Sequence, residues 1–372
     1  MIIRENIPLA SLTTMRLGGP ARYVIEIESE SDIEPAFDFA RSHNLPFFIL
    51  GGGANTIAHD EGFNGVIIKN AMQSIEILEG AEETKGQKDP FERPLWTGDG
   101  AGETPARAQS RVREAATAGP VQIAIMGGTI WDDAVAFACA HGLTGIEALS
   151  KIPGLAGAAP VQNIGAYGQD ISDTFISARV YDTKTHEFKI LSATDFHFSY
   201  RHSIMNTTEQ NRYFVISVTF SLHHGQMSRP FYNSVESYIA AHNITDFSPA
   251  SIRQIVSDIR ADKLPDPTTK PSAGSFFKNI YLTEEEAAVA ESKGYPVYRG
   301  HDGLKINSGW LIESCGLKGQ LLHGFRINPK SALVLINESA TSYNDLVAAR
   351  TEIINQVKAK FGYTLEQEPI EL

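Results

Sequence analysis

Hydrophobic positions along the first seventy residues follow two different periods. Apolar and polar residues alternate over 22–28, which predicts a strand, and an apolar stripe with helical spacing covers 31–46. A second strand is predicted over 46–53, where it runs into three consecutive glycines, and a third over 65–70. The pattern therefore predicts a small unit of mixed helix and strand.

Similar patterning resumes near residue 121 and predicts a second folded unit. We expect a strand, a glycine turn, and a helix that begins at about Trp131 and stops at Gly142. A loop dense in glycine follows over 152–168. Further strands are predicted at 178–183, 188–193 and 213–222.

Residues 79–119 separate these two units and differ from both. They contain eight acidic and six basic residues, with repeated glycine and proline and one stretch rich in alanine and arginine. Polar segments without a clear period add little to a core, so we interpret this stretch as a surface insertion.

Two helices are predicted in the last third of the chain. The first covers 249–261, where Ser248 suits the N-cap and a proline suits the first turn. The second begins at Ser342, with Asp345 completing a capping box, and ends at Gly362.

Composition and charge narrow the class of protein. The chain has 372 residues, enough for two or three domains that each bury a core. The 32 basic and 44 acidic side chains give a net charge of −12, which disfavours nucleic acid and anionic membranes as partners. Cys139 and Cys315 lie in apolar segments and are expected to be reduced thiols. With no apolar run of ~18 residues, we expect a soluble cytoplasmic protein.

Two glycine-rich loops are the candidate ligand sites. In LGGGAN (50–55), bare backbone at a strand end suits a pyrophosphate, although a tight turn is an equally ordinary interpretation. The stretch IPGLAGAAPVQNIGAYG (152–168) is more informative, because its glycines and alanines leave the backbone open to a flat heteroaromatic ligand. The alternative is a packed bend between strands.

Five motifs, taken with their order and spacing, resemble the UDP-N-acetylenolpyruvoylglucosamine reductase family, flavoproteins of bacterial cell-wall precursor synthesis. The resemblance covers about residues 6–77 and 121–368. The motifs are LGGGAN (50–55), IPGLAGAAPVQNIGAYG (152–168), FSYRHS (198–203), SAGSFFKN (272–279) and LEQE (365–368).

The resemblance implies an α+β protein with a two-part FAD-binding region of the vanillyl-alcohol-oxidase type and a C-terminal α+β substrate domain. It implies that NADPH reduces FAD, and that hydride then passes to the enolpyruvyl group of a UDP-sugar to give UDP-N-acetylmuramate. We expect a monomer without a metal ion. The implied parts are FAD-binding subdomain 1 (1–70), FAD-binding subdomain 2 (71–221, with the insertion 79–119) and a substrate-binding domain (222–372) whose C-terminal segment returns to the active site.

Three residues match the family's catalytic positions. Ser275 matches the proton donor, and Arg201 and Glu368 match the residues that bracket the substrate carboxylate. Because two bare carboxylates repel, Glu368 can act there only if it is protonated or bonded to a cation.

The remaining matched positions are implied to bind the cofactor or the substrate. Cofactor-binding positions are Gly51, Gly52, Gly53, Ala54, Asn55, Ile152, Pro153, Gly154, Gly157, Ala158, Gln162, Asn163, Gly165, Ala166, Tyr167 and Arg260. Substrate-binding positions are Tyr200, Tyr232, Lys263 and Asn279, the last two near the diphosphate or the carboxylate. Tyr232 is the candidate for a substrate-loop tyrosine, and Tyr238 competes with it.

Some positions depart from the family's motifs, and the sequence is also compatible with two other functions. Ala54 and Ala158 replace small hydroxyl residues found in the family, which removes possible contacts to the cofactor. One rival is a flavin-dependent oxidase or dehydrogenase acting on another substrate, since a fold alone does not fix function. Another is a noncatalytic protein that binds flavin or a nucleotide sugar.

Overall fold

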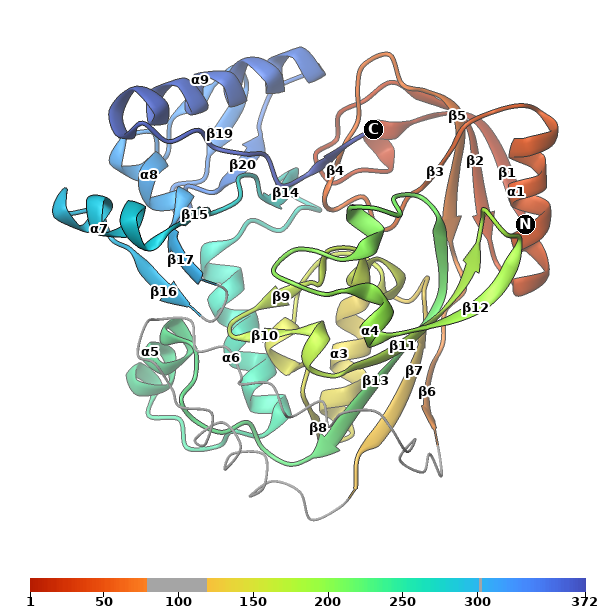
Figure 1. Ribbon diagram of the computed structural model, residues 1–372, viewed down its shortest axis with the longest axis horizontal. Coiled ribbons are helices and arrows are strands. Elements are labelled where there is room, and N and C mark those ends of the chain that lie inside the picture. Colours follow the sequence, from red (N-terminus) through yellow and green to blue (C-terminus); the bar gives the residue numbers. More distant parts are fainter. Residues whose placement is uncertain (79–118, 301–302) are drawn as a thin grey trace. The chain divides into compact units, whose positions relative to one another are not determined.

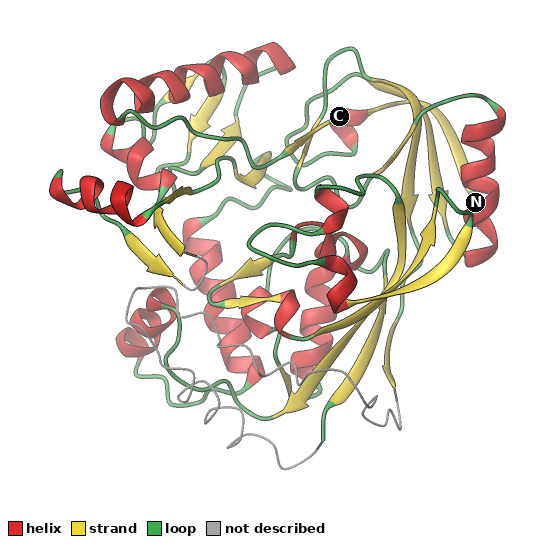
Figure 2. Cartoon of the chain, in the orientation of Figure 1, coloured by secondary structure: helices red, strands yellow, loops and turns green. Residues whose placement is uncertain are grey.

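The computed structural model describes residues 1–78, 119–300 and 303–372 (Figure 1). The predicted insertion at 79–119 therefore lies, apart from Gly119, outside the described residues. Helices and strands are mixed along the chain, which confirms the predicted α+β class (Figure 2). Within the described part, no helix is long and apolar enough to cross a bilayer.

The chain forms two compact units, each assembled from separate segments. The first consists of Met1–Ile2, Ile25–Gly51 and Ile68–Ile259, and the second of Ile3–Val24, Gly52–Ile67 and Arg260–Leu372. The division into two FAD-binding subdomains and a substrate domain stays a prediction.

A four-stranded sheet at the start of the chain has the order β1-β2-β5-β3. The helix that the apolar stripe predicts, α1 (Ile33–Ser42), lies in the sequence between β2 and β3. That helix is shorter than expected because Asn44 adopts a φ of 51°, a left-handed conformation that ends helical geometry. The strands are β1 (Ile2–Pro8), β2 (Pro20–Ile27), β3 (Phe47–Ile49) and β5 (Phe63–Asn70).

An antiparallel sheet of order β12-β11-β13-β7-β6 forms the centre of the first unit, with β8 paired to the end of β13. Its strands are β6 (Ile75–Leu78), β7 (Val121–Met126), β8 (Leu143–Thr144), β11 (Phe175–Asp182), β12 (Glu187–Ser192) and β13 (Tyr213–His224). Its core includes Trp131 at the start of α3 (Trp131–Ala140), whose ring meets Phe220 edge to face at 5.7 Å. Burying this aromatic pair anchors the helix on the sheet.

Shorter elements complete the first unit. The helix α5 (Asn233–His242) and most of α6 (Pro249–Lys263) share a separate apolar cluster that includes Phe231 and Ile252. As predicted, α6 begins after Ser248, whose hydroxyl accepts the Ser251 amide. The other elements are α4 (Ala193–Phe196), the strands β9 (Gly165–Ala166) and β10 (Gln169–Asp170), and the 3-10 helices η4 (Glu147–Leu149), η5 (Ala156–Gln162), η6 (Ile171–Asp173) and η7 (Ile204–Asn206).

The second unit contains two small sheets, of order β14-β20-β19-β18 and β15-β17-β16. Their strands are β14 (Ser272–Ser275), β15 (Ile280–Leu282), β16 (Tyr298–Gly300), β17 (Gly303–Ile306), β18 (Leu321–Leu322), β19 (Phe325–Ile327) and β20 (Val334–Asn337). The helices are α7 (Glu284–Ser292), α8 (Ser308–Ser314) and α9 (Tyr343–Phe361). Leu346, Ile353 and Val357 on α9 are fully buried in the unit's core.

The ends of α9 follow the sequence signals. Ser342 accepts a hydrogen bond from the Asp345 amide, Asp345 accepts one from the Ser342 amide, and Gly362 has a φ of 81° at the C-terminal end. Beyond this helix the chain runs past β14 and ends in β21 (Ile370–Glu371), which pairs in parallel with β4 (Thr56–Ile57) (Figure 1).

Candidate active site

The second predicted cofactor loop, 152–168, contains a short helix that ends at a buried asparagine. Its middle forms η5, and the helix ends at Asn163, which is buried and has a φ of 45°. The Asn163 side chain donates to the Ser199 carbonyl at 3.3 Å and accepts from the Ser172 amide at 3.1 Å. The asparagine therefore fixes the direction in which the chain leaves η5.

Close backbone approaches explain several small residues in the predicted cofactor loops. A Cβ at Gly157 would lie 3.0 Å from the Gly127 backbone, and one at Gly51 would lie 2.8 Å from the Cβ of Ala158. The second approach places the end of the first glycine loop against the second. Gly154, with a φ of 130°, faces open space, so this part of the loop offers bare backbone.

Arg201 is held against the same loop. Its guanidinium donates to the Gly165 carbonyl at 2.7 Å and to the Asn163 carbonyl at 3.4 Å. Its charged end also lies 4.9 Å from the centre of the Tyr200 ring. The predicted carboxylate-binding arginine and the predicted cofactor loop are thus brought together within the first unit.

The two candidate loop tyrosines have different surroundings. The Tyr232 ring, at the N-cap of α5, meets the Tyr167 ring edge to face at 5.7 Å. The Tyr238 hydroxyl donates to Asp258 on α6 at 2.8 Å, and this bond raises the pKa of Tyr238. Tyr238 therefore links two helices, whereas Tyr232 lies beside a predicted cofactor-binding residue.

An ion-pair cluster at the start of the loop was not singled out from the sequence. Asp132 on α3 accepts the Lys151 amide at 2.7 Å and the Lys151 ammonium at 2.8 Å, and Arg253 on α6 donates at 2.6 and 2.9 Å. Burial would raise the pKa of Asp132, but these cations hold it well below its usual range. The sequence does not predict such a cluster, because its members lie far apart in the chain, on two helices and in a loop.

In the second unit, Ser275 is the last residue of β14 and is exposed. It pairs with Val334, and the register shifts between Ser272 and Ser275. Gly274, with a φ of 69°, supplies the left-handed residue in this irregular stretch. The irregularity changes the direction of the strand directly before the predicted proton donor.

The C-terminal segment pairs with the residues that directly follow Ser275. The Glu368 amide donates to the Phe276 carbonyl at 2.9 Å, and the Lys278 amide donates to the Glu366 carbonyl at 2.9 Å. Phe277 and Gln367 form the antiparallel bridge between these contacts. LEQE thus lies alongside SAGSFFKN.

The first glycine loop joins this arrangement inside the second unit. The Thr14 amide donates to the Gly53 carbonyl at 3.1 Å, and the Thr14 carbonyl accepts the Ser272 amide at 3.0 Å. At the other end of the loop, the Asn55 carbonyl accepts the Ile370 amide at 3.0 Å. The loop is therefore held between the strand that carries Ser275 and the segment that carries Glu368.

The remaining predicted site residues lie at the end of α6, near the start of α8 and in the two glycine-rich loops. Arg260 and Lys263 are in the last turn of α6, and the Lys263 carbonyl accepts the Asn328 side chain at 3.0 Å. The Asn279 side chain accepts the Ser308 amide at 3.2 Å at the start of α8. The other predicted cofactor positions belong to the two loops: Gly52 and Ala54 to the first, and Ile152, Pro153, Gln162 and Ala166 to the second.

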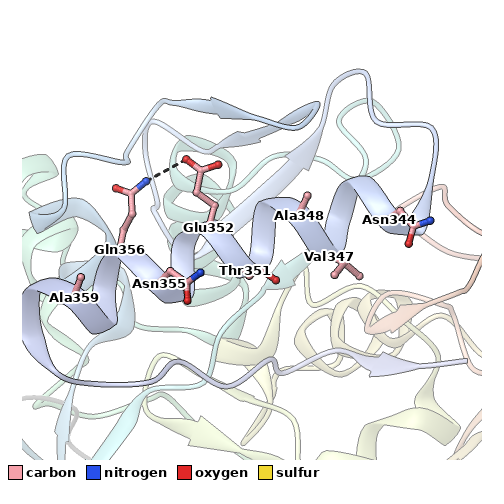
Figure 3. Close-up of a pocket in the computed structure, with 8 residues that line it drawn as sticks. All are labelled: Asn344, Val347, Ala348, Thr351, Glu352, Asn355, Gln356 and Ala359. Carbon is pink, nitrogen blue, oxygen red and sulfur yellow. Dashed lines mark hydrogen bonds between the residues drawn. The ribbon is translucent and has the colours of Figure 1, made fainter.

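A hollow on the surface of α9 is separate from these positions (Figure 3). It is lined by residues of this one helix, and none of them is a predicted site residue. They are Asn344, Val347, Ala348, Thr351, Glu352, Asn355, Gln356 and Ala359.

Comparison with known proteins agrees with the motif order. Residues 266–371 match the model of the UDP-N-acetylenolpyruvoylglucosamine reductase C-terminal domain. The chain is 33% identical over 372 residues to a UDP-N-acetylenolpyruvoylglucosamine reductase of Ralstonia nicotianae, covering 99% of each chain. It is 34% identical to a protein of the same name from Thermobifida fusca, covering 98% of this chain and 97% of the other.

A solved structure shares the fold. The crystal structure of UDP-N-acetylenolpyruvylglucosamine reductase from Thermus caldophilus superposes with a TM-score of 0.61 at 20% identity, covering 100% of this chain and 99% of that one. Full-length identity above 30% together with the C-terminal match shows that the chain belongs to the UDP-N-acetylenolpyruvoylglucosamine reductase family.

Proposed function

We propose that this protein reduces UDP-N-acetylenolpyruvoylglucosamine to UDP-N-acetylmuramate, with flavin, as FAD, for a cofactor and NADPH as the source of hydride. Family membership over the whole chain supports the reaction. The single observation that carries the site is the backbone pairing that places Glu368 beside the strand of Ser275.

The loop residues fit a flavin. The second loop offers bare backbone at Gly154, and the first loop touches it through Gly51 and Ala158. Two linked stretches of open backbone suit an extended ligand that has both a pyrophosphate and a flat ring, which FAD has and FMN lacks. A flavin held by these loops would supply hydride, received from NADPH, to the enolpyruvyl double bond.

The protein's own residues must then manage charge and a proton. Hydride addition to one carbon of the double bond leaves negative charge that spreads toward the substrate carboxylate, and the adjacent carbon must gain a proton. In the proposal the Ser275 Oγ delivers that proton. The balance is one hydride and one proton added to the substrate, with NADPH converted to NADP⁺ and the Ser275 hydroxyl proton restored from solvent.

Arg201 and Glu368 are proposed to act at the substrate carboxylate. The Arg201 guanidinium is fixed by two loop carbonyls, and its positive charge can stabilise the developing charge. Glu368 contributes if its carboxyl is protonated or bonded to a cation, because a second bare carboxylate would oppose the reaction.

The sugar nucleotide is proposed to contact Tyr200, Tyr232, Lys263 and Asn279. Tyr232 is favoured over Tyr238 because its ring lies against Tyr167, a proposed cofactor-binding residue. The Lys263 side chain is exposed at the end of α6, and its positive charge suits a diphosphate.

Two measurements test the proposal. The purified protein should show two visible absorption bands of an oxidised flavin and release FAD on denaturation. Under anaerobic conditions, NADPH should bleach these bands, and UDP-N-acetylenolpyruvoylglucosamine should restore them with formation of UDP-N-acetylmuramate.

The same experiment separates the rival functions. A flavin oxidase that acts on another substrate would lose its visible absorption bands on reduction and regain them only with oxygen. A noncatalytic protein would bind flavin or the sugar nucleotide without turnover. Either result would refute the proposed reaction.

A further inference from the structure

The segment that carries Glu368 is anchored by backbone at both ends. Before Glu368, the Glu366 carbonyl accepts the Lys278 amide, and after it Ile370 and Glu371 pair with β4. The conformation of the residues between these anchors determines where the Glu368 side chain projects.

One side chain of α9 contacts this intervening stretch on both sides of Glu368. Nη1 of Arg350 donates to Oε1 of Gln367 at 2.6 Å and to Oε1 of Glu371 at 2.5 Å. Nε2 of the Gln367 side chain in turn donates to the Pro369 carbonyl at 2.8 Å, which closes a turn across Glu368. The turn is therefore tied through a single guanidinium to the long, buried helix of the unit.

Arg350 and Glu371 form a partly buried ion pair. The exposed fraction of the side chain is 20% for Arg350 and 34% for Glu371. Burial would raise the pKa of Glu371, and hydrogen bonds from Arg350 and Tyr343 hold it below its usual value. Removal of the guanidinium would leave a partly buried carboxylate three residues from Glu368 without its main cation.

We infer that Arg350 is a positioning residue for Glu368. It fixes the turn 367–371, which keeps the Glu368 carboxyl in one orientation. It also neutralises Glu371, so that this neighbour adds no net charge close to Glu368. The inference rests on the proposed function, in which Glu368 acts at the substrate carboxylate after flavin reduction.

The test compares Arg350→Gln, Arg350→Lys and a control, Arg326→Gln. Arg326 is a suitable control because it is in the same unit and pairs with Glu338 at 2.6 Å, a pair with no contact to the C-terminal segment among the described residues. Two readouts are needed: hydrogen exchange of a peptide that spans 364–372, and anaerobic stopped-flow rates of the two half-reactions.

For Arg350→Gln we expect amide exchange at 367–371 at least tenfold faster, and reoxidation of the reduced flavin by the sugar nucleotide ten- to hundredfold slower. Bleaching by NADPH should stay within threefold of the wild-type rate. Arg350→Lys, which keeps the charge but not the planar fork, should recover part of the loss. The control should behave as wild type in both readouts.

Unchanged exchange, unchanged reoxidation, or equal loss in both half-reactions would overturn the inference. A wild-type protein whose reduced flavin is not reoxidised by the sugar nucleotide would instead refute the proposed function. In that case faster exchange in Arg350→Gln would still establish that Arg350 orders the turn, while its link to this reaction would be refuted.

Discussion

The amide of Glu368 donates a hydrogen bond to the carbonyl of Phe276 at 2.9 Å, although the two residues are far apart in the sequence. Phe276 follows Ser275 directly, so this bond places the proposed carboxyl-bearing residue beside the proposed proton donor. Substitutions at Ser275 and Glu368 should therefore affect the same half-reaction.

Ser275→Ala should impair only the second half-reaction. Loss of one positioned proton donor typically costs 10²–10⁴ in rate, whereas bleaching by NADPH needs no proton from this group and should stay within a few-fold of normal. Anaerobic stopped-flow absorbance measures both steps. Ser339→Ala, an exposed serine of the same unit, is the control. Normal reoxidation in Ser275→Ala would mean that another group or water delivers the proton.

The two candidate tyrosines should separate by substrate affinity and stability. Tyr232→Phe should raise the KM for the sugar nucleotide by about tenfold, the equivalent of one hydrogen bond. Tyr238→Phe should lower that free energy by about 1 kcal/mol, because it removes the bond to Asp258, and leave KM unchanged. Steady-state kinetics and urea denaturation measure the two quantities. The reverse outcome would make Tyr238 the loop tyrosine.

Asp132→Asn should weaken flavin binding. This carboxylate holds Lys151, which has a φ of 60° and directly precedes the second loop, so its loss should loosen the loop and raise the dissociation constant of FAD about tenfold. Titration of the apoprotein with FAD measures the constant. Asp182→Asn removes the same charge at a buried ion pair on β11 and should leave the constant unchanged. Equal effects of the two variants would assign Asp132 a purely structural role.

Asp182 should contribute to stability in a pH-dependent way. Its side chain is fully buried, and hydrogen bonds from Arg212 and Lys189 hold its pKa well below the ordinary 3.8. Because the folded pKa is depressed, the contribution is complete above pH 3.8 and disappears as the pH falls toward the folded pKa. Asp182→Asn should lower the free energy of unfolding by about 3 kcal/mol at pH 7.

Denaturation curves at several pH values check this expectation. The difference between wild type and Asp182→Asn should be constant from pH 5 to 8 and shrink below pH 3.8. A difference that grows on acidification would contradict the assigned sign.

The elements predicted best from the sequence are those with local signals. The capping box at Ser342 and the glycine at 362 bound α9 in the structure to within one residue of expectation. The N-cap Ser248 and the first-turn proline likewise located the start of α6. Caps and helical periodicity act within a few residues, so one stretch of sequence contains the whole signal.

Features that depend on distant partners were not predictable in the same way. The short helix η5 has a proline inside it and no apolar stripe, and its shape depends on contacts such as that between Gly157 and Gly127. Arg253 and Asp132 pair across two helices, and Arg350 meets Glu371 beyond the end of its own helix. Motif order gave no signal for the side chains that hold the C-terminal segment, because they lie outside the motifs.

The parallel pairing of β21 with β4 also bears on how the chain folds. This pair joins residues 56–57 to 370–371, and the core of the second unit likewise includes Met15 and Leu17 together with residues of the last third. During synthesis these early segments must therefore wait, without their final partners, until almost the whole chain has left the ribosome. Contacts of such long sequence separation are slow to form, so truncation near residue 365 should leave a nascent chain that exposes apolar surface and recruits chaperones.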